Sequence, residues 1–449
     1  MDRRAQHLAK FQNAFPHAVS WPGQPRYAAV TEIWAKSDTK PAIIVHCTDE
    51  TLVQRAVELA REAELPLSVR AGGHDWAGRA LCEGVVIDLT PMRTISISSD
   101  ARTAVVGGGA RANDLLPFTD ALGVVAATGA VGIVGFGGLT LGGGYGPLTG
   151  LLGLVCDNLI SARVVLADGR VVEAGPGGDE ELLWALRGGG GNFGVATSLT
   201  FALHEVPSVR SGLILYPFDE AQSVLGRLEP IASVLPDALD LPILLMPGPD
   251  GSPLLAIAPT WSGAKGEGEA QIAPLLELGT VLLADVKDCS YGNSRSIFDM
   301  YAVNGLRTAM ATRWLTRLHG DATAVMIEQI RRRPSPLCTV MTHPFHGAAT
   351  RIAPDAAAFG FRQPHVVIEI LAQADPAGAS DGSAERAWVQ ETAAALDQHA
   401  LPGGYANFLT AQDRERARHS YGPNAERLKR AKQRYDPQNL FASATPLPF

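Results

Sequence analysis

The most informative stretch of the sequence reads Arg70-Ala71-Gly72-Gly73-His74-Asp75 and directly follows an apolar run, Leu67 to Val69. The apolar run predicts a strand, and the two glycines predict a tight turn where that strand ends. Because glycine has no Cβ atom, the backbone N–H groups of such a turn can approach the phosphate oxygens of a ligand closely. One histidine, His74, stands at the point where these donors converge.

A second stretch, from Ala121 to Cys156, carries no charged residue and is rich in glycine. Twelve of its thirty-six residues are glycine, and ordering so many of them costs much chain entropy. Close approach of the backbone to a ligand explains that cost better than core packing does. The stretch is long enough to cross a membrane, but its glycine content favours a buried bed for a cofactor. The two stretches together predict a site for a large, flat cofactor that carries phosphate.

Composition narrows the class of protein. A chain of 449 residues can form two or three domains, and its charged content of 19% is that of a globular protein. A net charge of −8 without a basic stripe disfavours nucleic acid as a partner. No apolar signal segment follows Met1, so we expect a cytoplasmic protein without a membrane partner. We also expect reduced thiols and no metal site, because no metal-ligand spacing occurs among Cys47, Cys82, Cys156, Cys289 and Cys338.

The first part of the chain alternates apolar runs with helical patterns. Strands are predicted at 42–45, 67–69, 85–89, 103–106 and 195–204, and Asp168-Gly169 predicts a hairpin between 162–166 and 170–173. Thr48 is the expected N-cap of the helix that follows the first strand. A helix at 111–122 contains Pro117, which we expect to kink or split it.

After Val206 the pattern changes to segments punctuated by proline, with strands such as Leu254 to Ala258 and Val366 to Leu371. Helical patterns occupy 321–331 and 384–399, and a basic helix is expected at 425–434. The sequence therefore predicts an α+β protein with a first domain at 1–206, a second at 207–400 and a C-terminal segment at 401–449.

Two motifs have an ordinary structural interpretation beside a functional one. Gly189-x-Gly191-x-x-Gly194 matches a dinucleotide fingerprint, but a predicted helix precedes it and a strand follows it, which reverses the Rossmann order. A tight turn between the helix and the strand explains these glycines at least as well. A lone histidine such as His74 is most often packed against a sheet. Beside a glycine turn it can instead act as a base, or as a nucleophile toward an electron-poor ring.

Taken together, these elements resemble the FAD-linked oxidases with a vanillyl-alcohol-oxidase-type (PCMH-type) flavin domain, and among them the berberine-bridge-enzyme-like branch. The resemblance extends from about residue 41 to 441, and the combination of motifs is specific although each one alone is not. It rests on Ser68 to His74, Val86 to Leu89, Gly135 to Gly146, Leu154 to Asn158, Leu183 to Gly194, Tyr405 to Asn407 and Tyr435 to Phe441.

The resemblance implies a PCMH-type FAD-binding domain of two subdomains and a substrate domain with an antiparallel sheet covered by helices. It implies that His74 holds FAD covalently through the 8α-methyl group, and that Val195 contacts the adenine. The pyrophosphate would be wrapped by Arg70, Ala71, Gly72 and Gly73. The isoalloxazine and its chain would be lined by Thr128, Gly129, Val131, Gly132, Gly135, Gly138, Gly142 and Tyr145, with Tyr405 and Asn407 near the ring.

The sequence also departs from the family pattern. Many members carry a second covalent link from a cysteine, and Val131 occupies that position, so we expect a single linkage, as in the 6-hydroxynicotine oxidases. The run Phe359 to Arg362 replaces a Phe-Pro-His-Arg motif, and the Asn-rich ending is replaced by Ala442 to Thr445. The glutamate base of the plant enzymes has no clear counterpart. The sequence therefore leaves the substrate side open.

By resemblance, the protein is an FAD-dependent oxidase that removes a hydride from a C–H bond next to O or N and reduces molecular oxygen. Its substrate would be a small organic molecule or natural product. Tyr405 is the first choice as the base that takes the substrate proton, ahead of His343, His346 and Glu369, for which a structural role is the commoner case. Alternatives are a flavin dehydrogenase, an oxidative cyclase and a non-catalytic flavin-binding protein. The oligomeric state stays open.

Overall fold

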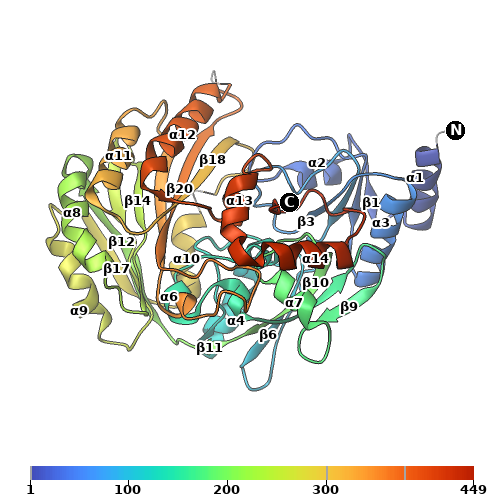
Figure 1. Ribbon diagram of the computed structural model, residues 1–449, viewed down its shortest axis with the longest axis horizontal. Helices are drawn as coiled ribbons and strands as arrows, with labels where there is room; N and C mark the ends of the chain where they lie inside the picture. The colour runs from blue at the N-terminus through green and yellow to red at the C-terminus, as the bar shows by residue number, and fades with distance from the viewer. Residues whose placement is uncertain (1–2, 300–301, 379–380) are drawn as a thin grey trace.

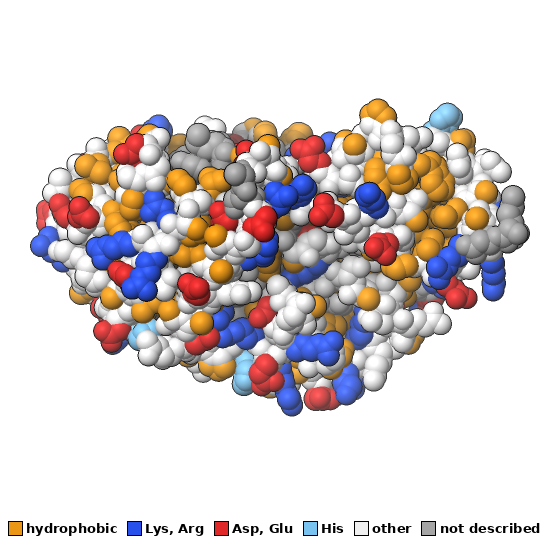
Figure 2. Space-filling model, turned by 90° about the horizontal axis from the view of Figure 1, so that it is seen from above, with side chains coloured by type: hydrophobic (Ala, Val, Ile, Leu, Met, Phe, Trp, Pro, Cys, Tyr) orange, Lys and Arg blue, Asp and Glu red, His pale blue; other side chains and the backbone are white. Residues whose placement is uncertain are grey.

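The computed structural model of the protein describes residues 3–299, 302–378 and 381–449. The molecule is elongated, and three larger sheets follow one another along its length (Figure 1). Charged side chains of both signs are scattered over the face seen in Figure 2, with no continuous basic stripe. In the part of the chain that the structure describes, no helix is long and apolar enough to cross a membrane.

The first sheet lies at the end of the molecule that holds the N-terminus (Figure 1). Its strands follow the order β1 (Val19–Ser20), β2 (Ile43–His46), β4 (Val85–Asp88) and β3 (Leu67–Arg70). The last three run parallel. Val45 and its two apolar neighbours in β2 are fully buried, as expected for a parallel strand covered on both faces. The helices of this region are α1 (Arg3–Ala14), α2 (Pro25–Thr31) and α3 (Glu50–Glu62).

Two local predictions need correction. The N-cap of α3 is Asp49, whose carboxylate accepts a hydrogen bond of 2.9 Å from the backbone N–H of Leu52. Thr48 instead donates its hydroxyl to Asp49, because a negative charge is the better acceptor at a helix N-terminus. The helix α4 (Ala112–Leu122) is continuous, so Pro117 does not split it.

The second sheet has five antiparallel strands in the order β5 (Ile95–Ile97), β6 (Thr103–Gly107), β10 (Val195–Ala202), β8 (Leu159–Val165) and β9 (Val171–Ala174). The predicted hairpin joins β8 to β9, and Gly169 has the positive φ of +86° that its turn requires. A small pair, β7 (Val124–Val125) and β11 (His204–Glu205), lies beside it. The helix α7 (Glu180–Leu186) leads into β10.

The uncharged glycine-rich stretch folds into short pieces rather than one long element. It contains the end of α4, then β7, α5 (Phe136–Leu141) and α6 (Thr149–Leu152). Three of the five cysteines, Cys47, Cys156 and Cys338, are buried, and Cys82 and Cys289 are half-buried.

The third sheet has ten strands, all paired antiparallel, as predicted. Helices α8 (Ala221–Ala232), α11 (Gly320–Arg331) and α12 (Ser383–Leu396) cover one face (Figure 1). Ile368 and Ile370 of β20 pack under these helices, so the alternate residues Glu369 and Leu371 face the opposite side. The strand order is β13 (Leu239–Asp240), β16 (Thr260–Trp261), β12 (Val209–Pro217), β15 (Pro253–Ile257), β14 (Ile243–Pro247), β19 (Cys338–Phe345), β20 (His365–Ala374), β18 (Arg307–Leu315) and β21 (Ala400–Leu401), with β17 (Leu283–Cys289) also on β12.

The remaining helices connect this sheet to the first part of the chain. The helix α9 (Gly268–Ile272) lies at the outer end, and α10 (Tyr291–Asp299) packs on α4. After β21, α13 (Arg414–Tyr421) and α14 (Ala425–Tyr435) return to the side of the first two sheets, where Tyr435 donates its hydroxyl to Asp179 at 2.7 Å. The α+β class predicted from the sequence is confirmed, and the domain boundaries at residues 206 and 400 remain predictions.

A buried ion pair joins the glycine-rich stretch to the segment before β20. Arg362 donates two hydrogen bonds of 2.8 Å to the carboxylate of Asp157. The two side chains are only 3% and 5% exposed. Arg362 also donates its Nε–H to the carbonyl oxygen of Phe359. The altered Phe359 to Arg362 run is therefore well packed, and Phe361 itself stacks on Trp314 at 4.5 Å.

We predict that Arg362→Met lowers the free energy of unfolding by about 3–5 kcal/mol, because it leaves the Asp157 carboxylate buried without a cation. The measurement is the urea midpoint of the purified protein. Arg351→Met is the matched control, because its pair with Asp237 is 61% and 43% exposed and exposed pairs contribute about 1 kcal/mol or less. Equal, small losses in both variants would contradict the prediction.

Candidate active site

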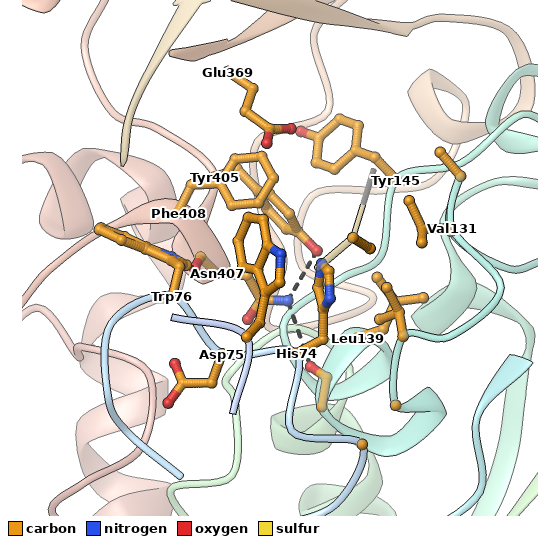
Figure 3. Close-up of a pocket in the computed structure, with 18 of the residues that line it drawn as sticks. His74, Asp75, Trp76, Val131, Leu139, Tyr145, Glu369, Tyr405, Asn407 and Phe408 are labelled. Atoms are coloured by element: carbon orange, nitrogen blue, oxygen red, sulfur yellow. Dashed lines mark hydrogen bonds between the residues drawn. The ribbon is translucent and has the colours of Figure 1, made fainter. Parts of the chain in front are cut away.

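A cavity of about 630 Å³ lies between the glycine-rich stretch and the inner face of the ten-stranded sheet. Figure 3 shows side chains entering it from both sides, with Glu369 on one side and His74 on the other. Pockets that hold small molecules and cofactors usually have volumes of about 300–1,000 Å³, so this cavity is large enough for a cofactor and a substrate site together with little spare room.

His74 lies in the turn after β3, with its ring stacked on the indole of Trp34 at 4.4 Å between centroids. The turn is fixed by the backbone N–H of Trp34, which donates to the carbonyl oxygen of Gly73 at 2.9 Å. Burial, together with a smaller effect of the Arg111 charge, lowers the pKa of His74 to about 4. The imidazole is therefore neutral at pH 7 and keeps a free lone pair.

Gly72 and Gly135 bring two backbone segments into direct contact. A Cβ atom on Gly72 would lie 2.4 Å from the Cα atom of Gly135, and one on Gly135 would lie 2.5 Å from the nitrogen of Gly72. No side chain fits at either position. The contact joins the His74 turn to the start of α5, so both segments form one wall of the cavity.

Most of the residues that the sequence assigned to the cofactor do line this cavity. They come from the His74 turn, the glycine-rich stretch, the start of β10 and the segment after β21. They are Ala71, Gly72, Gly73, His74, Gly129, Val131, Gly135, Gly138, Tyr145, Val195, Tyr405 and Asn407.

The other four assigned residues lie behind the wall and support it. Arg70 is 3.6 Å from Asp88, and the hydroxyl of Thr128 is 3.0 Å from that of Tyr291. The N–H of Gly132 donates to Asp299 at 2.7 Å. Gly142 has no room for a side chain, because a Cβ atom there would meet the Asn407 amide at 2.0 Å.

Tyr405 is held by two donors. Its hydroxyl oxygen accepts hydrogen bonds from the backbone N–H of Gly144 at 3.1 Å and from the side-chain amide of Asn407 at 2.9 Å (Figure 3). Burial raises the pKa of Tyr405 well above its ordinary value. The phenol therefore keeps its proton at neutral pH, which suits a hydrogen-bond donor better than a base.

Tyr145 beside it is oriented by His365. The Nδ1 atom of His365 lies 2.8 Å from the carbonyl oxygen of Gln363, which can only accept, so the ring proton is on Nδ1. The hydroxyl of Tyr145 then donates to Nε2 at 2.8 Å. Burial lowers the pKa of His365 to about 3, so this ring is neutral and fixed as an acceptor.

His343 and Glu369 form a pair on the inner face of the sheet, where both line the cavity. The Nε2 atom of His343 lies 3.1 Å from a carboxylate oxygen of Glu369, and the two side chains are 21% and 8% exposed. His346, the fourth base candidate, is not among the described residues that line the cavity. Its Nε2 atom lies 3.3 Å from the carbonyl oxygen of Pro236 instead.

The turn Gly188 to Gly194 lies between α7 and β10, as its structural interpretation predicted, and two of its glycines also line the cavity. Asn192 donates its amide to the carbonyl oxygen of Thr445 at 2.9 Å, and Ser443 donates to that of Leu67 at 3.1 Å. The altered C-terminal tail therefore closes one end of the cavity. That end is apolar, with walls formed by Leu67, Val69, Leu89, Val195 and Phe441.

Sequence reasoning missed several cavity residues. Trp34 stacks on His74, and the indole N–H of Trp76 donates to the carbonyl oxygen of Asn407 at 2.8 Å. The position of Trp76, two residues after His74, was a usable signal. Asp240 and Arg295 also line the cavity, and no local pattern marks either of them.

Comparison with known proteins agrees with this geometry. A model of the FAD binding domain matches residues 41–175, and a model of the berberine and berberine-like domain matches residues 404–448. The FAD-linked oxidoreductase aurO of Gibberella zeae is 30% identical, over 97% of this chain and 86% of that protein. The chain belongs to the FAD-linked oxidoreductases, in the berberine-bridge-enzyme-like branch. The predicted family is confirmed, and the protein is an FAD-dependent enzyme.

Other similar proteins include the (R)-6-hydroxynicotine oxidase of Paenarthrobacter nicotinovorans, which is 29% identical over 94% of both chains. The crystal structure of 6-hydroxy-D-nicotine oxidase from Arthrobacter nicotinovorans has a TM-score of 0.82 and 27% identity, over 94% of this chain and 96% of that one. Berberine bridge enzyme has a TM-score of 0.86 at 19% identity, over 100% and 99% of the two chains, which shows the shared fold.

The cavity fits FAD in its shape and donors. The wall from Gly129 to Gly138 carries no charge, so it can cover an aromatic ring system, and the His74 turn offers backbone N–H groups to phosphate. A Cβ atom on Gly138 would meet nothing within 4 Å, so open space lies directly over α5. The Nε atom of Arg70 is buried without a hydrogen-bond partner, beside the turn that would hold the pyrophosphate.

We predict that Gly138→Leu keeps the fold and weakens the initial binding of FAD by roughly tenfold or more, about 1.4 kcal/mol, so that the purified protein contains less flavin. The new side chain has open space and a good helix propensity, but it fills the volume that the cofactor needs. The measurement is the flavin-to-protein absorbance ratio, together with a thermal unfolding curve.

Gly226→Leu is the matched control. Gly226 lies within α8, a Cβ atom there also meets nothing within 4 Å, and the position is outside the cavity. A normal flavin content in the Gly138→Leu protein would mean that the cofactor does not pass over α5.

Proposed function

We propose that this enzyme is an oxidase that takes a hydride from a C–H bond next to O or N of a small organic or natural-product substrate. It does so with a single covalently bound FAD on His74 and with molecular oxygen as acceptor. The observation that carries the proposal is the His343–Glu369 pair, which faces the His74 wall across one cavity. The oxidase names of the nicotine-oxidase relatives support it.

When bound, FAD accepts the hydride and transfers the electrons to oxygen. The residues of the chain must then take the O–H or N–H proton of the substrate within hydrogen-bond distance. Glu369 suits this role because its carboxylate faces the cavity and His343 fixes its orientation at 3.1 Å. Tyr405 suits the role of a donor, because its pKa is raised by burial. Glu369 therefore replaces Tyr405 as our first choice for the base.

His74 suits the covalent attachment because its imidazole is neutral at pH 7 and therefore nucleophilic. Val131, at the position where other members carry a cysteine, lines the cavity with an inert isopropyl group. This supports a single linkage. We also propose a cytoplasmic location, which suits five cysteines that form no disulfide.

We predict that wild-type protein on an acid-washed denaturing gel fluoresces under ultraviolet light and that His74→Ala protein does not. Removal of the imidazole removes the attachment atom without removing the glycine wall. His343→Ala is the control, and its band should stay fluorescent. A dark wild-type band from yellow protein would contradict covalent attachment, and a fluorescent His74→Ala band would exclude His74 as the link.

We predict that a panel of alcohols, amines and sugars contains a substrate that yields one peroxide per molecule oxidised. With that substrate, Glu369→Gln should lower kcat by roughly 10²–10⁴-fold, the usual contribution of a general base. Gln373→Ala is the matched control, because Gln373 lies on the same face of β20 and also lines the cavity. It should change KM more than kcat.

The same assays separate the alternatives. Flavin that is reduced by substrate but releases electrons only to an artificial acceptor would identify a dehydrogenase. Flavin that no compound of the panel reduces would support a non-catalytic protein. Equal kcat values for Glu369→Gln and the wild type would remove Glu369 as the base.

A further inference from the structure

One edge of the cavity is polar, and the mechanism above does not use it. It is formed by Ser211, Asp240, Thr260 and Arg295, which we call the Arg295 cluster. Thr260 pairs in register with both Ser211 and Asp240. Its hydroxyl lies 2.8 Å from that of Ser211 and accepts a long hydrogen bond of 3.5 Å from Arg295. The sheet and α10 together therefore hold the four side chains in one place.

Arg295 brings a buried positive charge to this edge. The residue is 2% exposed, its Nε–H donates to the hydroxyl of Ser294 at 3.1 Å, and its guanidinium lies 5.2 Å from the ring centroid of Tyr291. Among the residues that the structure describes, the partners of this side chain are the hydroxyls of Ser294 and Thr260 and the ring of Tyr291, and none of them is a carboxylate. Hydroxyls and an aromatic ring do not neutralise the charge, and a buried guanidinium without an anion is costly.

Asp240 offsets this charge only in part. Burial raises its pKa to about 7, against the opposing influence of Arg295 from α10 and His343 from β19. Burial therefore favours the neutral carboxylic acid, so Asp240 compensates the charge of Arg295 less than an exposed carboxylate would. In its protonated form Asp240 can also donate a hydrogen bond.

Apart from His343, which contacts Glu369, the wall between the cluster and Glu369 is mainly apolar. Leu244, Met246, Ala258, Met341 and Leu371 line this part of the cavity. The chain continues from Asp240 into β14. In the sheet, β19 lies between β14 and β20, and β20 carries Glu369. Two inter-strand spacings amount to about 10 Å. A molecule that contacts both ends therefore needs an elongated, mainly apolar body.

We propose that Arg295 binds a carboxylate of the substrate, with Thr260 and Asp240 beside it, at the end opposite to the one where Glu369 takes the proton. The substrate class is then an elongated, mainly apolar or aromatic acid. This inference rests on the proposed function in one respect, that the same molecule presents its C–H bond to the flavin. A guanidinium offers paired N–H donors that match a carboxylate.

The test is isothermal titration calorimetry of the flavin-loaded enzyme with trans-cinnamate, cinnamamide and cinnamylamine, which share one body and differ in charge. We expect cinnamate to bind roughly tenfold or more tightly than cinnamamide. In Arg295→Met, we expect cinnamate affinity to fall roughly 10–100-fold, the range for hydrogen bonds to charged groups, and cinnamamide affinity to stay unchanged.

Two further variants keep the test decisive. Arg295→Lys preserves the charge and should retain part of the cinnamate affinity even if Arg295→Met folds poorly. Asp240→Asn leaves the guanidinium in place and should keep or improve cinnamate binding. Tightest binding of cinnamylamine, lost in Asp240→Asn, would overturn the proposal in favour of a cation site. Equal affinities for all three compounds, unchanged in Arg295→Met, would also overturn it.

The calorimetry does not require turnover, so it separates this inference from the proposed function. Preference for cinnamate together with a failed peroxide assay would contradict the oxidase and leave the anion site standing. Peroxide release from uncharged substrates together with no preference for cinnamate would contradict the anion site and leave the oxidase standing.

Discussion

The close approach of Gly72 and Gly135 is the constraint on which the rest of the site depends. Each residue occupies the space that the other's Cβ atom would need. Arg111 bridges to Gly135 and donates to the carbonyl oxygen of Gly72 at 3.3 Å, so the start of α4 meets the same point. The turn after β3, the start of α4 and the start of α5 are thereby fixed together. His74 faces the glycine-rich wall because of this contact, and its ring is stacked on Trp34.

The flavin side could be predicted from the sequence because its determinants are local. The strand at 67–69, the Gly72-Gly73 turn and the hairpin at Asp168-Gly169 are all encoded within a few residues, and each is present in the structure. Errors at this level are small, such as the cap at Asp49 instead of Thr48. The sequence could not show which of these residues line the cavity and which lie behind that lining. Thr128 and Gly132 turn toward α10, an element more than 150 residues away.

The substrate side could not be predicted, because its pairs form only when distant strands align. His343 meets Glu369 through the register of β19 with β20, and Asp240 meets Thr260 through that of β13 with β16. Alternation along β20 places Glu369 on the face of the sheet that lines the cavity. The sequence could not show that Gly144 and Asn407 both donate to the hydroxyl of Tyr405, or that burial raises its pKa. Phe361, in the run that departs from the family motif, is stacked on Trp314, a contact that forms only in the folded chain.

The two walls of the cavity differ in how they meet the cost of burial. The glycine wall has no charge to desolvate, so it can be dry before and after a flat ring covers it. The sheet wall holds Glu369, His343 and Asp240, with Arg295 of α10 beside it, and buried charged groups such as these are stable only with partners, water or ligand. A charged ligand that pairs with one of these groups offsets the free energy cost of burying it, and a neutral ligand of the same shape does not. Selectivity is therefore a property of the sheet wall, and side chains on its inner face can change without disturbing the contact between Gly72 and Gly135.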